Sequence, residues 1–356
     1  MNDPRLAIPS SKSSPTYFVA DIAANHDGSL ERAVELIRLA ALSGANAAKF
    51  QNFRASTIVS KQGFKELGKK LTHQSKWKKE VYEVYEAAEL PIEWSDTLVK
   101  TCEENGIDYF TAPYDLDLIN YFSTKMKYFK VGSGDITWKQ SLELIALQRK
   151  PILLATGASE LWEVERAVKL LQEYNVEIIL MQCNTNYTGA ENNFDYVNLL
   201  VLNEYHRKFP DVILGLSDHS IGHTAVLGAV ALGARVIEKH FTDDTDREGP
   251  DHSFSLNPSQ WSKMVDDTRI LERCLGDGHK KIEKNEVDAK IVQRRALRYK
   301  KFMKAGTEIT EQDLIALRPC PDDGIDPFDV NKLIGKILNS DVTADQMVRE
   351  NDFRIK

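Results

Sequence analysis

Cysteine is scarce in this chain, and its spacing argues against two common kinds of site. The 356 residues contain four cysteines, and no two of them form a CxxC pair or another metal-ligand spacing. They are scattered along the sequence as Cys102, Cys183, Cys274 and Cys320. We therefore expect reduced, structural thiols rather than a disulfide framework or a cysteine-bound zinc ion.

The chain also lacks an excess of positive charge. Lys and Arg number 46 against 53 Asp and Glu, which gives a formal net charge of -7 at pH 7. This balance argues against nucleic acid and membrane surfaces as partners. Residues 1–17 contain no apolar stretch, so neither a secretory signal nor a spanning helix is expected there. We expect a disordered lead over residues 1–16 and a cytoplasmic protein.

What the sequence does contain is a repeated alternation of short β-rich runs and longer amphipathic stretches. This alternation predicts parallel strands joined by helices. One such helix is expected from Ser29 to Ser43, where Ser29 can cap a stripe of apolar residues. Eight strands are predicted, at residues 17–23, 47–51, 108–112, 128–133, 152–156, 177–183, 212–217 and 236–241.

Eight strand and helix units favour a (β/α)8 TIM barrel, which we place at residues 17–276. Polar side chains stand at the end of nearly every predicted strand, and in a barrel these ends meet at one face, where active sites are built. The alternative, an open doubly wound sheet, would leave most of these ends unused. A charged linker is expected over residues 277–292 and a small, mostly β domain over residues 293–356.

Two of the strand ends suit a small anion. Alternation places Lys49 and Gln51 on one face of the second strand, directed into the barrel mouth. Lys130 ends the fourth strand and precedes the run 132–135, whose glycines allow the backbone to approach an oxyanion closely. Together these residues predict a site for a multiply charged anion such as a phosphorylated acid.

Two other strand ends suit a metal ion. His219 follows the seventh strand and His240 closes the eighth, so both imidazoles can converge on a divalent ion of the Mn or Zn kind. Two histidines leave positions open for water and substrate. The alternative is a pair of structural histidines with satisfied hydrogen bonds. Other residues near these strand ends remain candidates for the site: Glu238, Asp251, His26, His223 and His252.

Short motifs stand at several of the predicted strand ends, and two more lie in the tail. Those of the barrel are ADIAANHDG at 20–28, KFQ at 49–51, KVGSG at 130–134, GLSDH at 215–219 and EKHFT at 238–242. Those of the tail are RRAL at 294–297 and LRP at 317–319. The order and spacing of the barrel motifs resemble the N-acetylneuraminate (sialic acid) synthase family, and the tail is similar to that family's C-terminal antifreeze-like (SAF) domain. Several motifs in register are far more specific than any one alone.

The resemblance implies an enzyme that condenses phosphoenolpyruvate with an open-chain N-acetylated amino sugar. The sugar would be N-acetylmannosamine or a 2,4-diacetamido hexose, and the products a sialic-acid-type nonulosonic acid and phosphate. The resemblance also implies a domain-swapped homodimer, in which Arg318 of the small domain reaches the barrel of the partner subunit.

The resemblance assigns a role to each candidate side chain. His219 and His240 would hold a divalent metal, Mn first, with Mg and Co as alternatives. The catalytic residues would be Asp21, Asp135 and Glu238. The substrate-binding residues would be Lys49, Gln51, Lys130, Ser133, Asn184, Tyr187, Ser217, Asp251 and Arg318.

Several positions depart from the family pattern. Asp21 and Asp135 stand where glutamates are usual, and the sixth strand reads QCNTNY at 182–187. Two hydroxyl positions expected to touch phosphoenolpyruvate are Ala112 and Ala155. The neighbouring residues Thr111 and Thr156 would compensate only if adjacent strand residues did not face opposite ways. We therefore expect an altered sugar preference, because polar contacts discriminate strongly between substrates.

Two other functions stay open at this point. Another metal-dependent aldolase or keto-acid-sugar synthase on the same barrel would keep the metal and the lysines but take a different sugar. A non-catalytic sugar-binding relative would keep the fold and lose turnover. The presence of both histidines, both lysines and Arg318 argues against the second alternative, because a binding protein has little need of a metal with open positions.

Overall fold

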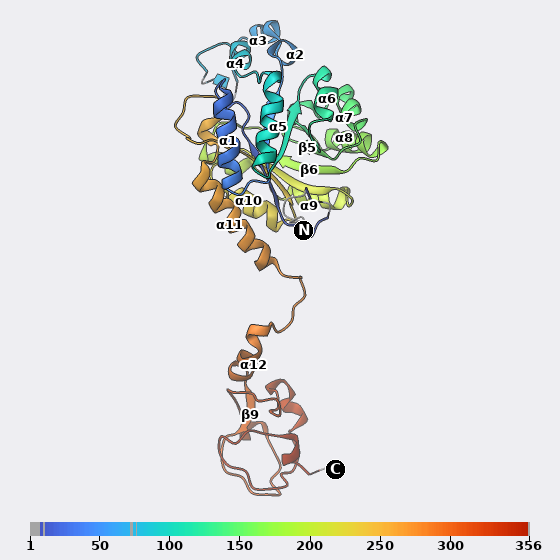
Figure 1. Cartoon of the computed structure of the whole chain (residues 1–356). Helices are drawn as coiled ribbons and strands as arrows, with labels where there is room; N and C mark the ends of the chain where they lie inside the picture. The colour runs from blue at the N-terminus through green and yellow to red at the C-terminus, as the bar shows by residue number, and fades with distance from the viewer. Residues whose placement is uncertain (1–7, 10, 72–73, 76, 355–356) are drawn as a thin grey trace. The chain divides into compact units, whose positions relative to one another are not determined.

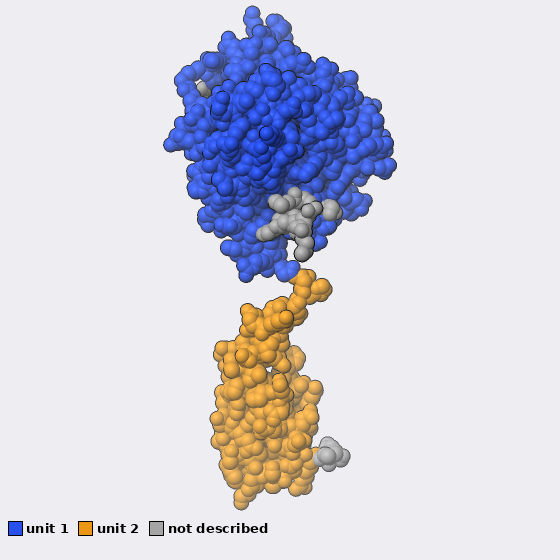
Figure 2. Space-filling view, viewed as in Figure 1, with its two compact units in different colours: residues 1–276 blue, residues 277–356 orange. Residues whose placement is uncertain are grey.

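The computed structural model describes residues 8–9, 11–71, 74–75 and 77–354. The chain forms two compact units, Met1–Gly276 and Asp277–Lys356, which are coloured separately in Figure 2. Part of the predicted lead, residues 1–7 and 10, lies outside the described residues. Two later lead residues contact the barrel: Lys12 Nζ donates to Pro210 O at 2.6 Å, and Thr16 N donates to Glu272 Oε1 at 2.6 Å. In the described part of the chain, no helix has the length and apolar character needed to cross a membrane.

Unit 1 is built on eight parallel strands, and the predicted fold is confirmed. The ladder order is β3-β2-β1-β8-β7-β6-β5-β4, and the two strands at the ends of this order contact each other, so the sheet is a nearly closed barrel. Every predicted strand is found, with ends that differ by at most two residues. The strands are β1 (Tyr17–Asp21), β2 (Ala47–Asn52), β3 (Asp108–Pro113), β4 (Phe129–Val131), β5 (Ile152–Ala155), β6 (Ile178–Cys183), β7 (Ile213–Asp218) and β8 (Val236–His240).

Helices lie around the outside of this barrel (Figure 1). The first begins after Ser29 as predicted, and Ser29 Oγ accepts a hydrogen bond from Arg32 N at 3.2 Å. Three short helices, α2 to α4, lie together at one end of the unit, between β2 and α5 (Figure 1). The helices are α1 (Leu30–Leu42), α2 (Ala55–Ile58), α3 (Lys61–Leu67), α4 (Val81–Ala87), α5 (Ser95–Glu104), α6 (Leu116–Ser123), α7 (Lys139–Ala146), α8 (Leu161–Glu173), α9 (Val201–Lys208), α10 (Thr224–Ala231) and α11 (Pro258–Leu275).

Aromatic side chains fill the amino-terminal end of the barrel interior. Tyr17 begins β1, and its ring packs edge-on against Tyr128, with centroids 6.0 Å apart. Phe110 packs against Tyr128 from β3, at 5.0 Å. All three side chains are buried. The space that remains inside the barrel therefore lies at the carboxyl ends of the strands, where the polar residues are.

Unit 2 has a small core of its own. Its strands β9 (Ala296–Tyr299) and β10 (Leu314–Leu317) form an antiparallel pair. The helix α12 (Val287–Gln293) precedes them and extends one residue past the range 277–292 predicted as a linker. The core is made of Leu297, Tyr299, Met303, Ile309, Leu314, Leu333, Leu338, Val342, Val348 and Phe353. This separate apolar cluster explains why the segment is compact without a large sheet.

Candidate active site

A cavity of about 540 Å³ lies at the carboxyl ends of the barrel strands. Residues far apart in the sequence reach it because parallel strands in a barrel end at the same face. Of the fourteen site residues proposed from the sequence, twelve line this one cavity: Asp21, Lys49, Gln51, Lys130, Ser133, Asp135, Tyr187, Ser217, His219, Glu238, His240 and Asp251.

Four charged side chains are buried together in the cavity. Lys49 Nζ lies 2.6 Å from Asp21 Oδ2, and Lys130 Nζ lies 3.0 Å from Glu238 Oε1. Burial opposes ionisation of Glu238, but Lys130 and Lys49 outweigh it and lower the pKa of Glu238 to about 2. Burial also opposes a charge on Lys49, and there Asp21 and Glu238 prevail and raise the pKa of the amine. The network therefore holds both lysine side chains at the wall of the cavity.

The two histidines from β7 and β8 lie side by side, with ring centroids 5.3 Å apart. Burial lowers the pKa of both to about 3, helped by His240 beside His219 and by Lys49 beside His240. Both imidazoles are therefore neutral, which is the form that binds metal ions. His219 Nδ1 lies 2.9 Å from the carbonyl oxygen of Asn184, so this nitrogen carries the proton and Nε2 keeps its lone pair.

A tight cradle around Gly157 forms another part of the cavity wall. Gly157 N donates to Ser133 Oγ at 2.9 Å. A side chain on Gly157 would meet this hydroxyl at 2.9 Å and Cys183 Sγ at 3.1 Å, and would clash with Thr185. Only glycine fits at this position. Because it has no side chain, the Ser133 hydroxyl and the Thr185 side chain can both lie at the cavity wall.

Ala112 and Ala155 stand where hydroxyl side chains were expected, and the neighbouring threonines do not take their place. Thr111 Oγ1 donates to Asn52 Oδ1 at 2.7 Å, on the face of β3 that is turned away from the barrel interior. Thr156 Oγ1 donates to Met181 O at 3.0 Å and accepts a hydrogen bond from Tyr205. Neither threonine lines the main cavity. Strand alternation therefore keeps both hydroxyls away from a ligand in the cavity.

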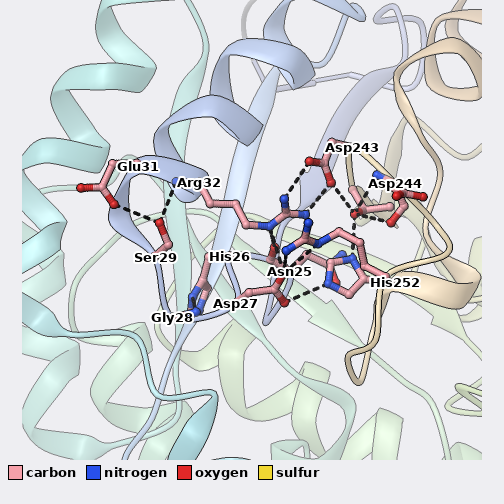
Figure 3. Close-up of polar contacts among 12 residues, drawn as sticks. Asn25, His26, Asp27, Gly28, Ser29, Glu31, Arg32, Asp243, Asp244 and His252 are labelled. Carbon is pink, nitrogen blue, oxygen red and sulfur yellow. Dashed lines mark hydrogen bonds and ion pairs between the residues drawn. The ribbon is translucent and has the colours of Figure 1, made fainter.

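Two loops are tied together beside the cavity. Arg32 binds Asp243 through both carboxylate oxygens, and its Nε lies 3.1 Å from Asp27 Oδ2. His252 Nε2 lies 3.0 Å from Asp27 Oδ1, so Asp27 is shared between the arginine and the histidine (Figure 3). This network fastens the segment after β8 to the segment after β1. Asp251, whose Oδ2 accepts from Ala24 N at 3.2 Å, is thereby held at the cavity wall.

Comparison with known proteins agrees with this geometry. The NeuB family matches residues 36–280, and the SAF domain matches residues 294–354. The chain belongs to the NeuB family. It is 34% identical to the N,N'-diacetyllegionaminic acid synthase of Campylobacter jejuni over 94% of this chain and 99% of that protein. It is 32% identical to the pseudaminic acid synthase of the same species, over 95% and 96% of the two chains.

A solved structure supports the same membership. The N-acetylneuraminic acid (sialic acid) synthetase of Leptospira borgpetersenii, crystallised with citrate, superposes with a TM-score of 0.69 at 27% identity. The match covers 78% of this chain and 90% of that chain. The resemblance predicted from the sequence motifs is therefore confirmed, for the barrel and for the SAF domain.

Two of the proposed site residues lie elsewhere in this NeuB-family chain. Asn184 follows β6, and its side chain turns outward, where Nδ2 donates to Tyr196 O at 3.0 Å. It does not line this cavity, and its carbonyl oxygen lies 2.9 Å from His219 Nδ1; the substrate contact expected of its side chain stays a prediction. Arg318 is an exposed residue of unit 2, and its role stays a proposal.

Sequence reasoning missed the part of the cavity wall that comes from the α2 to α4 segment. This connection runs from residue 53 to 94, much longer than an ordinary βα loop, and that length is itself a signal of a functional loop. No strand ends there, so a search of strand ends overlooks it. The segment contributes Phe53, Ile58, Gln74, Trp77, Val84, Tyr85 and Ala88 to the cavity.

The buried carboxyl group of Asp251 predicts that the fold loses stability as the pH rises. Burial, which outweighs the hydrogen bond from Ala24, raises its pKa from 3.8 to about 7. The folded state therefore binds the proton more tightly than the unfolded state, and stability falls as pH rises from about 4 to about 7. Asp251→Asn removes this loss. The free energy of unfolding of the variant should therefore rise relative to that of the wild type across this pH range, by up to about 4 kcal/mol. Urea unfolding at pH 5, 6, 7 and 8 measures the gain.

Asp243→Asn is the matched control from the same loop. Burial also opposes ionisation of Asp243, but the hydrogen bond and the charge of Arg32 outweigh it and lower the pKa of Asp243 below 3.8. That carboxylate adds stability above its unfolded pKa, so the asparagine variant should be less stable than the wild type at every one of these pH values. An Asp251→Asn difference that stays constant from pH 5 to pH 8 would contradict the assignment.

Proposed function

We propose that this chain is a nonulosonic acid synthase, which joins phosphoenolpyruvate to an open-chain N-acetylated amino sugar and releases phosphate. One observation carries the proposal: two buried lysines and two neutral histidines share one cavity at the mouth of the barrel. The lysines suit the anion, and the histidines suit the ion that would polarise an aldehyde. The synthases named among its relatives support the same class of reaction.

In this proposal the anion lies against the lysines and the glycine cradle. Lys49 and Lys130 neutralise the carboxylate and phosphate, and Ser133 donates a hydrogen bond to the same ligand. Gln51 and Ser217 are further donors at this wall; Ser217 Oγ now donates to Glu238 Oε1 at 3.0 Å. Glu238 stays ionised because of its two lysines, so its role is to orient them and not to move a proton.

The proton-transfer groups are the carboxyl groups that titrate near neutrality. Burial raises the pKa of Asp135 to about 6, and that of Asp251 is about 7. A group whose pKa lies near the working pH is suited to general acid and base catalysis. Asp135 and Asp251 thus exchange protons with the water and the sugar hydroxyls. Asp21 pairs with Lys49 and orients it. Tyr187 contacts the sugar; the centroid of its ring lies 4.1 Å from that of the His219 ring.

His219 and His240 fit a divalent metal, for which we propose Mn, with Mg or Co as alternatives. His240 Nδ1 is buried and, among the residues that the structure describes, has no hydrogen-bond partner. The same residues contain no group of three or more His, Cys, Asp or Glu side chains around one point, so water and substrate would complete the coordination. When bound, the ion acts as a Lewis acid toward the aldehyde oxygen of the sugar.

The choice of sugar is tested by phosphate release. We expect a 2,4-diacetamido-trideoxyhexose to be a better substrate than N-acetylmannosamine, because Asp21 and Asp135 are shorter than the glutamates usual in the family and Thr185 replaces part of the usual sixth-strand sequence. The assay combines phosphoenolpyruvate, Mn²⁺ and a panel of N-acetylated hexosamines. A higher kcat/KM for N-acetylmannosamine would contradict the sugar assignment. No phosphate release with any sugar would contradict the proposed function, and release with other aldoses would favour the related keto-acid-sugar synthases.

Arg318 is proposed to act in the partner subunit of a domain-swapped homodimer. Its rigid planar guanidinium suits the acetamido group of the sugar. One chain carries Arg318→Ala, and a second carries His219→Ala; each should be inactive alone. Co-refolded mixtures should regain up to about a quarter of wild-type activity, because half of the statistical mixture is heterodimer and each heterodimer has one complete site. Confirmed heterodimers without activity would place Arg318 in its own subunit's site or outside the chemistry.

A further inference from the structure

Tyr114 lines the cavity from the end of β3, where sequence reasoning assigned no functional residue. It stands two residues after Ala112, so strand alternation gives both side chains the same inward direction. Its backbone N donates to Asn52 O at 2.9 Å, which continues the register of β3 against β2. The ring packs edge-on against Phe53, with centroids 6.4 Å apart. The phenol thus lines the cavity just past the end of the strand that carries Ala112.

Gly132 makes room for this phenol. Its backbone is extended, with φ −66°, a conformation that any residue adopts. A side chain there, however, would lie 2.9 Å from Tyr114 Cε1 and would clash with the phenol oxygen. Gly132 is therefore explained by Tyr114 and not by backbone conformation. The contact places the phenol hydroxyl beside Ser133, within the run that joins Lys130 to Asp135.

The Tyr114 hydroxyl is a free donor. It makes no hydrogen bond to any of the described residues, although it lines a cavity with several acceptors. Burial, and then the negative charges of Asp135 and Asp21, raise its pKa well above 10. The phenol therefore keeps its proton at neutral pH. Its O–H group is suited to donate a hydrogen bond to an anionic oxygen.

We propose that Tyr114 donates a hydrogen bond to bound phosphoenolpyruvate and so replaces the hydroxyl that Ala112 lacks. The inference rests on the proposed function for the identity of the ligand. The longer tyrosine reaches the ligand from the next inward position on the same strand end. Tyr114 is thus a substrate-binding residue of this chain, and Gly132 is the position that allows it.

The test compares phosphoenolpyruvate binding to the full-length wild type and to Tyr114→Phe by isothermal titration calorimetry, without the sugar. Phenylalanine keeps the ring packing on Phe53 and over Gly132, so the fold is retained. We expect Kd to rise about 10- to 100-fold, as for the loss of a hydrogen bond to a charged group. The double variant Tyr114→Phe with Ala112→Thr should recover part of this affinity, because threonine restores a hydroxyl on the same face.

Tyr109→Phe is the matched control. Tyr109 lies on the other face of β3, where its ring stacks on Phe50 with centroids 5.8 Å apart, and its hydroxyl is buried outside the cavity. Its removal should leave the Kd unchanged. Equal Kd values for the wild type and Tyr114→Phe, or an equal rise for Tyr109→Phe, would overturn the role of Tyr114 while leaving the proposed function intact. A wild-type chain that does not bind phosphoenolpyruvate overturns both.

Discussion

Replacement of His219 or His240 by alanine should abolish turnover and lower the affinity for Mn²⁺ by at least about 100-fold. Each variant leaves a single protein ligand of the proposed pair, because the described residues offer no third side chain around that point. Without the ion, nothing in the cavity provides a Lewis acid for the aldehyde oxygen. Calorimetric titration of the apoprotein with Mn²⁺ measures binding independently of activity, and excess chelator should abolish wild-type turnover.

His26→Ala is the control for this experiment. His26 is as deeply buried as the histidine pair, packs edge-on against Trp94 and does not line the cavity. Its pKa is also lowered by burial, to about 4, so it is a neutral imidazole like the pair. Mn²⁺ affinity should therefore survive its loss. Full activity in excess chelator, or in either cavity variant, would exclude the metal assignment.

Replacement of Lys49 or Lys130 by methionine should raise the KM for phosphoenolpyruvate by about 100-fold or more and leave the KM for the sugar within a few-fold. Each lysine is buried at the cavity wall, where loss of one partner of a charge pair costs several kcal/mol of binding. The Lys130 variant also leaves the Glu238 carboxylate without its nearest cation, and this carboxylate repels the anion further. Steady-state kinetics with each substrate varied in turn separates the two KM values.

Lys239→Met controls for the loss of a buried ion pair. Lys239 lies between the two cavity residues of β8 but faces the other way, where its Nζ lies 2.6 Å from Asp218 Oδ2. Its removal should lower the stability of the fold, since it also leaves a buried carboxylate unpaired, but it should not raise the KM for phosphoenolpyruvate selectively. A sugar KM that rises in place of the phosphoenolpyruvate KM would mean that the two subsites are reversed.

The barrel was predictable from local pattern because each strand carries its own signal. The runs at 47–51 and 236–241, for example, combine buried apolar residues with period-two placement of Lys49, Gln51, Glu238 and His240, and the structure has both strands within one residue of the predicted ends. Because parallel strands of a barrel end at one face, the predicted strands indicated that the polar side chains at their ends would meet, and twelve of the proposed residues line one cavity.

The sequence by itself therefore determined the strand order, the inward residues and the family, since these depend on periodicity and motif spacing. Contacts between segments distant in the sequence were decided by the tertiary structure alone. Asn184 orients His219 through its carbonyl oxygen, while its side chain donates to Tyr196 O. Tyr114 enters the cavity because Gly132, which directly follows β4, has no side chain to exclude it. Both effects arise from packing between strands, which no local pattern encodes.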